Sequence, residues 1–211
     1  RELRITDAGL YSIDLGCNRS LAKLELTGNH FGTLNIRGAN DAYQKTLLAD
    51  INLSNNELTS VTLNDMYTIH KLNLSNNKLT ELGLKDSDML EQLNVAYNQL
   101  TDLNLSYCTL MTDLDISHNA ISSITLPSEL SLKRIHCENN AFTFPTLPVI
   151  EGLEEFTYSP QNDVKISSKG PGCDLSAHNF QNATVYEWHS AADDALLVNG
   201  TDYSEADGKT R

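Results

Sequence analysis

The chain has 211 residues, with 28 acidic and 15 basic side chains and a formal net charge of -13 at pH 7. Nucleic acid is excluded as a partner by this charge, because phosphate binding needs a basic face. No apolar run approaches the roughly 18 residues that a membrane span requires, so we expect no direct membrane insertion.

One phrase recurs along the chain: leucine, two residues, leucine, one residue, leucine, two residues, asparagine, one residue, leucine. The clearest copies are residues 48–58 and 69–79. The marker asparagines of the phrase are Asn29, Asn56, Asn77, Asn98, Asn119 and Asn140, and Ala8 and Gln161 occupy the same place in the first and last copies. Every step between markers is 21 residues except the step from Asn29 to Asn56, which is 27 (56 − 29). We therefore expect eight repeats and a six-residue insertion on a loop near 37–45.

The leucine spacing predicts the architecture. Alternating leucines such as Leu72 and Leu74 lie on one side of a short extended segment. A second pair in each copy, such as Leu82 and Leu84, points back from the opposite wall. Each coil then has two apolar edges that only its neighbours can bury, which predicts a mostly β solenoid with a parallel sheet of about eight short strands. The marker asparagines turn the chain, and we expect their amides to bond to backbone groups of their own and the next coil as a structural ladder.

Over residues 1–161 the chain resembles the leucine-rich-repeat family, in the bacterial 21-residue class called IRREKO repeats and in internalin-like surface proteins. The resemblance implies a right-handed solenoid, and a repeat of 21 residues leaves no room for a full helix on the convex side. Cys137 stands in a leucine position, as this class allows, and we expect it to be buried. Phe31, Phe142 and Phe156 also replace leucines.

The cysteines predict no disulfide framework. Cys17 and Cys108 fall at turns four repeats apart, about 20 Å at the usual coil spacing, whereas a disulfide needs Cα atoms within about 7 Å. The redox compartment stays open on this evidence.

The outward positions of the predicted strands form the candidate binding face. They are polar, small and mixed in sign. The candidate partner-binding residues are Asn52, Asn73, Asn94, Asp115, Tyr97, His118 and His136. Two interpretations stay open: these side chains contact a partner, or they are solvated and the asparagines bond to one another along the sheet. A metal site at Asp115, His118 and His136 is disfavoured because no supporting pattern surrounds them. A protein partner is favoured over a glycan, because Tyr97 alone could stack on a sugar.

A second segment follows the repeats, at 162–211. Short strand-like runs at 163–166, 183–188 and 195–198 are separated by Gly, Asn and Asp. They resemble part of the immunoglobulin-like module that follows such repeats in bacterial surface proteins, with Trp188 as the core tryptophan of an unfinished sandwich. We expect the chain to be a fragment of a longer protein.

No enzymatic site is expected. Cys173, Asp174 and His178 form the only nucleophile-like group, and a lone cysteine near a histidine in a loop is usually an ordinary cysteine. The acidic residues at 86–88 and 193–194 lack the glycine and glutamate of a calcium loop. No catalytic, cofactor or metal residue is therefore assigned.

The sequence predicts a non-catalytic recognition module of an exported bacterial surface protein, at the cell surface or outside the cell. It would bind a host or bacterial surface protein through its sheet face. Two alternatives remain: a structural spacer that displays another domain, or the repeat region of a secreted effector whose catalytic domain, such as a cysteine ubiquitin ligase, lies elsewhere.

Overall fold

The protein is described by a computed structural model that covers residues 1–15, 20–36, 48–63, 67–85, 87–143 and 146–162, together with the backbone of three short strands in the tail. None of these residues is helical. Within the same ranges, no helix has the length and apolar character to cross a membrane. The chain divides into two compact units, one made of 1–141 and 148–162 and the other of 142–147 and 163–211.

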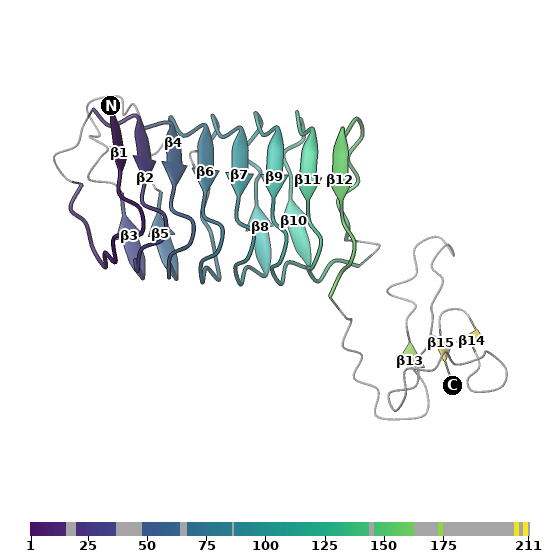
Figure 1. Cartoon of the computed structure of the whole chain (residues 1–211). Coiled ribbons are helices and arrows are strands. Elements are labelled where there is room, and N and C mark those ends of the chain that lie inside the picture. Colours follow the sequence, from purple (N-terminus) through teal and green to yellow (C-terminus); the bar gives the residue numbers. More distant parts are fainter. Residues whose placement is uncertain are drawn as a thin grey trace. The chain divides into compact units, whose positions relative to one another are not determined.

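An eight-stranded parallel sheet forms one wall of the first unit, and its strands stand side by side in a row (Figure 1). In spatial order these strands are β1 (Glu2–Arg4), β2 (Lys23–Glu25), β4 (Asp50–Asn52), β6 (Lys71–Asn73), β7 (Gln92–Asn94), β9 (Asp113–Asp115), β11 (Arg134–His136) and β12 (Glu155–Thr157). Each strand pairs with the next one coil later, as Leu72 with Leu93 and Leu93 with Leu114. The predicted solenoid with a parallel sheet, to which each repeat contributes one strand, is confirmed.

The single irregular step leaves the sheet intact. Lys23 on β2 pairs with Asp50 on β4, and Leu24 pairs with Ile51, so a spacing of 27 residues gives the same register as 21 elsewhere. The register of the sheet is therefore unchanged across the longer step. The predicted insertion near 37–45 lies outside the described residues.

Two smaller parallel pairs form on the returning side of the coils. They are β3 (Thr33–Asn35) with β5 (Ser60–Thr62), and β8 (Asp102–Asn104) with β10 (Ser123–Thr125). Turns and these short extended segments take the place of a convex helix.

The core lies between the two walls. In the eight-stranded sheet, the central residues of the six inner strands are buried, namely Leu24, Ile51, Leu72, Leu93, Leu114 and Ile135. From the returning side, Leu63, Leu84, Leu103 and Leu105 are also buried, whereas Val61, Leu82, Ile124 and Leu126 are half-buried. Phe31 and Phe142 fill leucine positions inside the core, but Phe156 on the last strand is 39% exposed because no described coil covers it.

The marker asparagines are buried and bond only to backbone. The Nδ2 group of Asn77 donates to Leu53 O at 3.1 Å, in the preceding coil, and to Leu74 O and Ser75 O in its own coil. Its Oδ1 accepts from Leu58 N, again in the preceding coil, at 3.0 Å. The set repeats at Asn29, Asn56, Asn98, Asn119 and Asn140. The bonds thus join each coil to the one before it, not to the next one as the sequence alone led us to expect.

Gln161 extends this ladder into the last coil. Its Nε2 donates to Cys137 O at 2.9 Å in the preceding coil and to Tyr158 O in its own. Glutamine can therefore occupy the marker position at the end of the stack.

Both described cysteine side chains are buried free thiols. Cys137 is fully buried in its leucine position, as predicted, and Cys108 is equally buried. Burial, together with the nearby Asp88 charge, raises the pKa of Cys108 to about 11, and burial with Glu138 raises the pKa of Cys137 to about 12. Neither thiol is therefore poised for nucleophilic chemistry at neutral pH.

In the second unit, three short strands are described: β13 (Cys173–Asp174), β14 (Glu205–Ala206) and β15 (Lys209–Thr210). They pair antiparallel in the order β13-β15-β14. The predicted strand runs at 163–166, 183–188 and 195–198, Trp188, and the side chains of the Cys173, Asp174 and His178 group lie outside what the structure describes.

Candidate functional site

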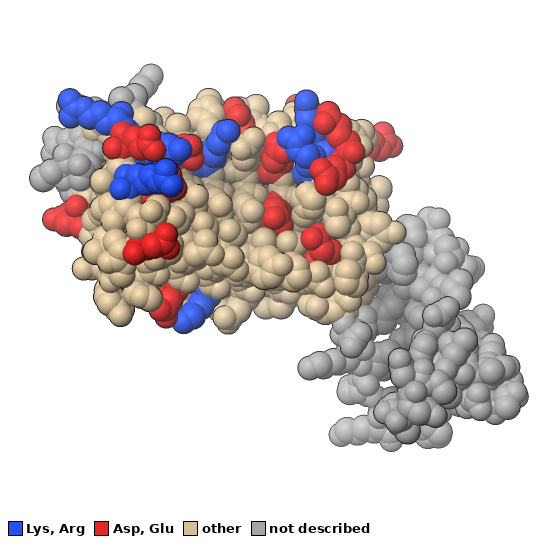
Figure 2. Space-filling view, in the orientation of Figure 1, with Lys and Arg blue, Asp and Glu red and all other residues tan. Residues whose placement is uncertain are grey.

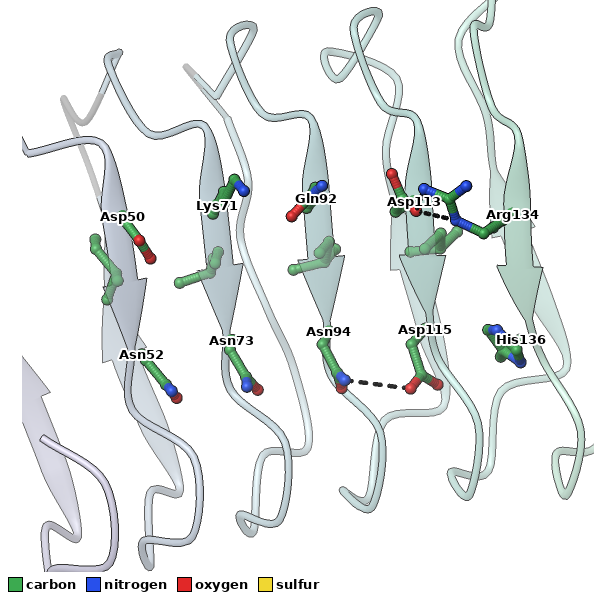
Figure 3. Close-up of a pocket in the computed structure, with 14 residues that line it drawn as sticks. Asp50, Asn52, Lys71, Asn73, Gln92, Asn94, Asp113, Asp115, Arg134 and His136 are labelled. Carbon is green, nitrogen blue, oxygen red and sulfur yellow. Dashed lines mark hydrogen bonds and ion pairs between the residues drawn. The ribbon is translucent and has the colours of Figure 1, made fainter. Parts of the chain in front are cut away.

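A shallow groove of about 370 Å³ crosses the sheet face over five strands, β4 to β11. Each three-residue strand points its middle residue inward and its two outer residues to the face, so two rows of polar side chains border the groove (Figure 3). The first row is Asp50, Lys71, Gln92, Asp113 and Arg134. The second row is Asn52, Asn73, Asn94, Asp115 and His136. Five of the seven predicted partner-binding residues are therefore brought into one line.

The second row also shapes the turn that follows each strand. The Oδ1 atoms of Asn52, Asn73 and Asn94 accept hydrogen bonds from the backbone N–H two residues later, at 3.0–3.1 Å. Asp115 does the same with Ser117 N and also accepts from Ser117 Oγ at 2.7 Å. These short side chains are well suited to such turns, which accounts for their recurrence without any ligand.

Of the three Asn Nδ2 groups in this row, one donates a hydrogen bond to another described residue. Asn94 Nδ2 donates to Asp115 Oδ2 at 3.2 Å. Among the described residues, Asn94 and Asp115 form the only side-chain pair within the row, so the asparagines do not bond to one another along the sheet. The Nδ2 groups of Asn52 and Asn73 point to the face, free to meet a partner.

The first row is largely neutralised by ion pairs. Lys23 lies 3.8 Å from both Glu2 and Asp50, and Arg134 pairs with Asp113 and lies 3.6 Å from Glu154. In Figure 2, basic and acidic side chains accordingly intermix along the upper edge of this face. Such exposed pairs set the charge pattern more than the stability.

A ridge of corner residues follows the strands, immediately before each of the first seven markers. All seven corners have a left-handed backbone, with φ between 51° and 66°. The corner residues are Asp7, Gly28, Asn55, Asn76, Tyr97, His118 and Asn139. Asp, Gly and Asn tolerate this conformation, whereas for a bulky residue such as Tyr97 it is a genuine outlier. Recurrence of Asp, Gly and Asn at this one repeat position is a sequence signal for a left-handed corner.

The corner conformation gives a direct prediction for Gly28, whose φ is +66°. A Cβ atom there would lie 2.0 Å from Asp7 Oδ1, and even after that side chain moves, the left-handed backbone costs about 1–2 kcal/mol. We expect Gly28→Ala to lower the free energy of unfolding by this amount in urea titrations followed by circular dichroism. Gly32→Ala is the matched control, because nothing lies within 4 Å of its added Cβ. If both variants unfolded at the same urea concentration, an alanine at position 28 would not be strained.

Tyr97 and His118 form a stacked pair on the ridge. Their ring centroids are 4.0 Å apart and the ring planes differ by 10°. Asn139 Nδ2 lies 3.2 Å from His118 Nε2, which extends the pair into the next coil. The predicted cluster of Tyr97, His118 and His136 is thus divided: the first two are in contact, whereas His136 lines the groove and lies 3.6 Å from Glu155.

No group of three or more His, Cys, Asp or Glu side chains in the described ranges could hold a metal ion. Asp115, His118 and His136 thus do not converge.

Comparisons with known proteins agree with this geometry. A profile described as a leucine-rich repeat matches residues 107–124. The fold is similar to the structure titled functional domain of InlJ from Listeria monocytogenes, which includes a cysteine ladder, with a TM-score of 0.50 and 18% identity. The similarity covers 74% of this chain but 43% of that one, so this chain spans less than half of that structure. No curated protein matches the sequence.

Proposed function

We propose that this chain is a non-catalytic recognition module that binds a protein partner through the groove of its sheet face. The observation that carries the proposal is the pair of polar rows over β4 to β11, with Asn52 and Asn73 presenting amide donors that no described residue uses. A rigid row of donors at one coil spacing is suited to directional hydrogen bonding with little loss of entropy.

A binding role is better supported than a catalytic one. The groove is shallow, and the described thiols are buried with raised pKa values. The mostly half-buried polar rows and the stacked pair of Tyr97 and His118 on the corner ridge resemble the polar rim and aromatic anchors of protein interfaces. None of the described residues that line the groove is a tyrosine, tryptophan or phenylalanine, which favours a protein over a glycan.

The proposal includes export to the bacterial surface, with the segment 162–211 as part of an immunoglobulin-like module. The likeness of the solenoid to InlJ and the antiparallel pairing of β13 to β15 support it. Expression of the whole gene in its native host, followed by protease shaving of intact cells, would test exposure; complete protection of the solenoid would contradict it.

Blocking the groove is the central test. Gln92 lies in the middle of the first row, and Gln92→Arg would fill the groove without removing a hydrogen bond that the structure shows. We expect capture of solubilised surface proteins by the immobilised chain to fall at least about tenfold, the size of losing one central contact. Ser123→Arg on β10 places the same side chain on the returning wall and should leave capture unchanged.

The outcomes separate the alternatives. Equal capture by the Gln92→Arg, Ser123→Arg and unmodified chains would rule out the groove as the contact surface. A chain that captures nothing above a bead control would favour the structural spacer.

A further inference from the structure

The side-chain contacts along the corner ridge are interrupted between Asn76 and Tyr97, and this interruption is here called the gap. Asn76 Nδ2 donates to Asn55 Oδ1 at 3.0 Å, so the amide of Asn76 turns toward the preceding coil and away from Tyr97. Tyr97 instead stacks on His118, in the following coil. Asn76 therefore makes its corner contact with the preceding coil, whereas Tyr97 makes its contact with the following coil.

One ring face of Tyr97 is left uncovered by this arrangement. His118 covers the face toward its own coil, and the other face looks toward Asn76, whose Nδ2 is engaged elsewhere. Tyr97 remains 52% exposed. A planar group can therefore slide onto the free face, with the Asn76 Oδ1 atom as a nearby acceptor.

Two acidic side chains on the coils that follow Tyr97 make no ion pair with any described residue. Asp115 makes no ion pair with any described residue, and its Oδ2 atom is directed to Asn94 in the coil of Tyr97. Glu138, one coil further, has a buried Oε2 atom without a hydrogen-bond partner. Lys78, which follows Asn76 by two residues, pairs with Glu57 at 2.8 Å. Figure 2 shows acidic but no basic side chains on the lower part of the face, over the region of β9 and β11.

We propose that the gap between Asn76 and Tyr97 binds an arginine side chain of the partner protein, an inference that rests on the proposed function. A guanidinium is planar and weakly hydrated, stacks on tyrosine faces and donates several hydrogen bonds. Here it lies on Tyr97, donates to Asn76 Oδ1 and is attracted by Asp115. The net charge of -13 on the whole chain also favours a partner with basic side chains.

Arginine binding would account for a tyrosine at a left-handed corner, a conformation that asparagine adopts with less strain. At the equivalent positions, Asn55 and Asn76 form their own bond with the same backbone conformation. Tyr97→Asn should therefore unfold at an equal or higher urea concentration than the unmodified chain. A residue that served the fold alone would not behave in this way.

The test is a titration of the isotopically labelled chain with the peptide acetyl-Gly-Arg-Gly-amide, observed by NMR. We expect saturable shifts at Tyr97 and His118, weaker with the lysine peptide and absent with the uncharged citrulline peptide. Tyr97→Asn should raise the half-saturation concentration roughly fivefold, in line with the loss of one cation–aromatic contact. The control is Tyr107→Asn, since Tyr107 is also 52% exposed but lies off the face; it should change nothing.

Three results would overturn the proposal. Equal shifts with the arginine and lysine peptides that persist in Tyr97→Asn would indicate general attraction to an acidic surface. Saturable binding of a neutral trisaccharide at Tyr97, without arginine binding, would assign the ring to a glycan. Loss of partner capture in Gln92→Arg without any response to the arginine peptide would leave the recognition role standing and remove arginine from it.

Discussion

Replacing Asn119 by alanine is expected to lower the free energy of unfolding by roughly 2–4 kcal/mol. The Asn119 amide donates to Val95 O at 2.9 Å and to Ile116 O and Ser117 O at 3.1 Å, and its Oδ1 accepts from Leu100 N at 3.0 Å. Asn119 is only 7% exposed, so water is poorly placed to replace the side chain. Each buried backbone group left without a partner costs about 1–3 kcal/mol.

The measurement is urea unfolding followed by far-ultraviolet circular dichroism. The sole tryptophan, Trp188, lies outside the solenoid unit, so its fluorescence is not a suitable probe. Asn104→Ala is the matched control: Asn104 is exposed and accepts one bond, from Ser106 N at 3.0 Å. We expect it to change stability by less than about 1 kcal/mol. Similar midpoints for the two variants would show that the buried ladder does not hold the coils together.

Truncating Phe31 should be at least as damaging, at about 3–5 kcal/mol for Phe31→Ala. Phe31 is fully buried in a leucine position of the second coil. Its removal leaves a cavity that the stacked coils cannot close, because their spacing is set by the hydrogen bonds of the sheet.

Phe156→Ala provides the comparison, since Phe156 also replaces a repeat leucine but is 39% exposed and lies on the last strand. We expect a loss of about 1 kcal/mol or less from its partly covered ring. If the two alanine variants unfolded at the same urea concentration, burial of the repeat position would not be the source of stability.

Much of the solenoid could be predicted from the sequence because its contacts repeat. Leu72 pairs with Leu93, and Leu93 pairs with Leu114, because each residue lies beside the one 21 positions later. The repeat period therefore predicts which residues are in contact. The same reasoning placed Cys137 inside the core. It extended even to the irregular step, where Lys23 pairs with Asp50.

The candidate site was less accessible to sequence reasoning. The repeat predicted that Asn52, Asn73, Asn94, Asp115 and His136 share a face, and the structure lines them along one groove. It did not predict that the Oδ1 atoms are occupied by the turns, because that bond depends on the path of the chain after the strand. The structure stacks Tyr97 on His118 at the corner and places His136 along the groove, a distinction that the repeat spacing does not make.

The sequence by itself determined the number of coils, the register of the sheet and the division between inward leucines and outward polar residues. These features follow from periodicity, which places every residue beside its equivalent one repeat away. Only the tertiary structure decided the direction of the asparagine bonds toward the preceding coil, the left-handed backbone at Tyr97 and the contact of Tyr97 with His118. Each of these depends on the backbone conformation and side-chain orientation within a coil, which a repeat spacing does not specify.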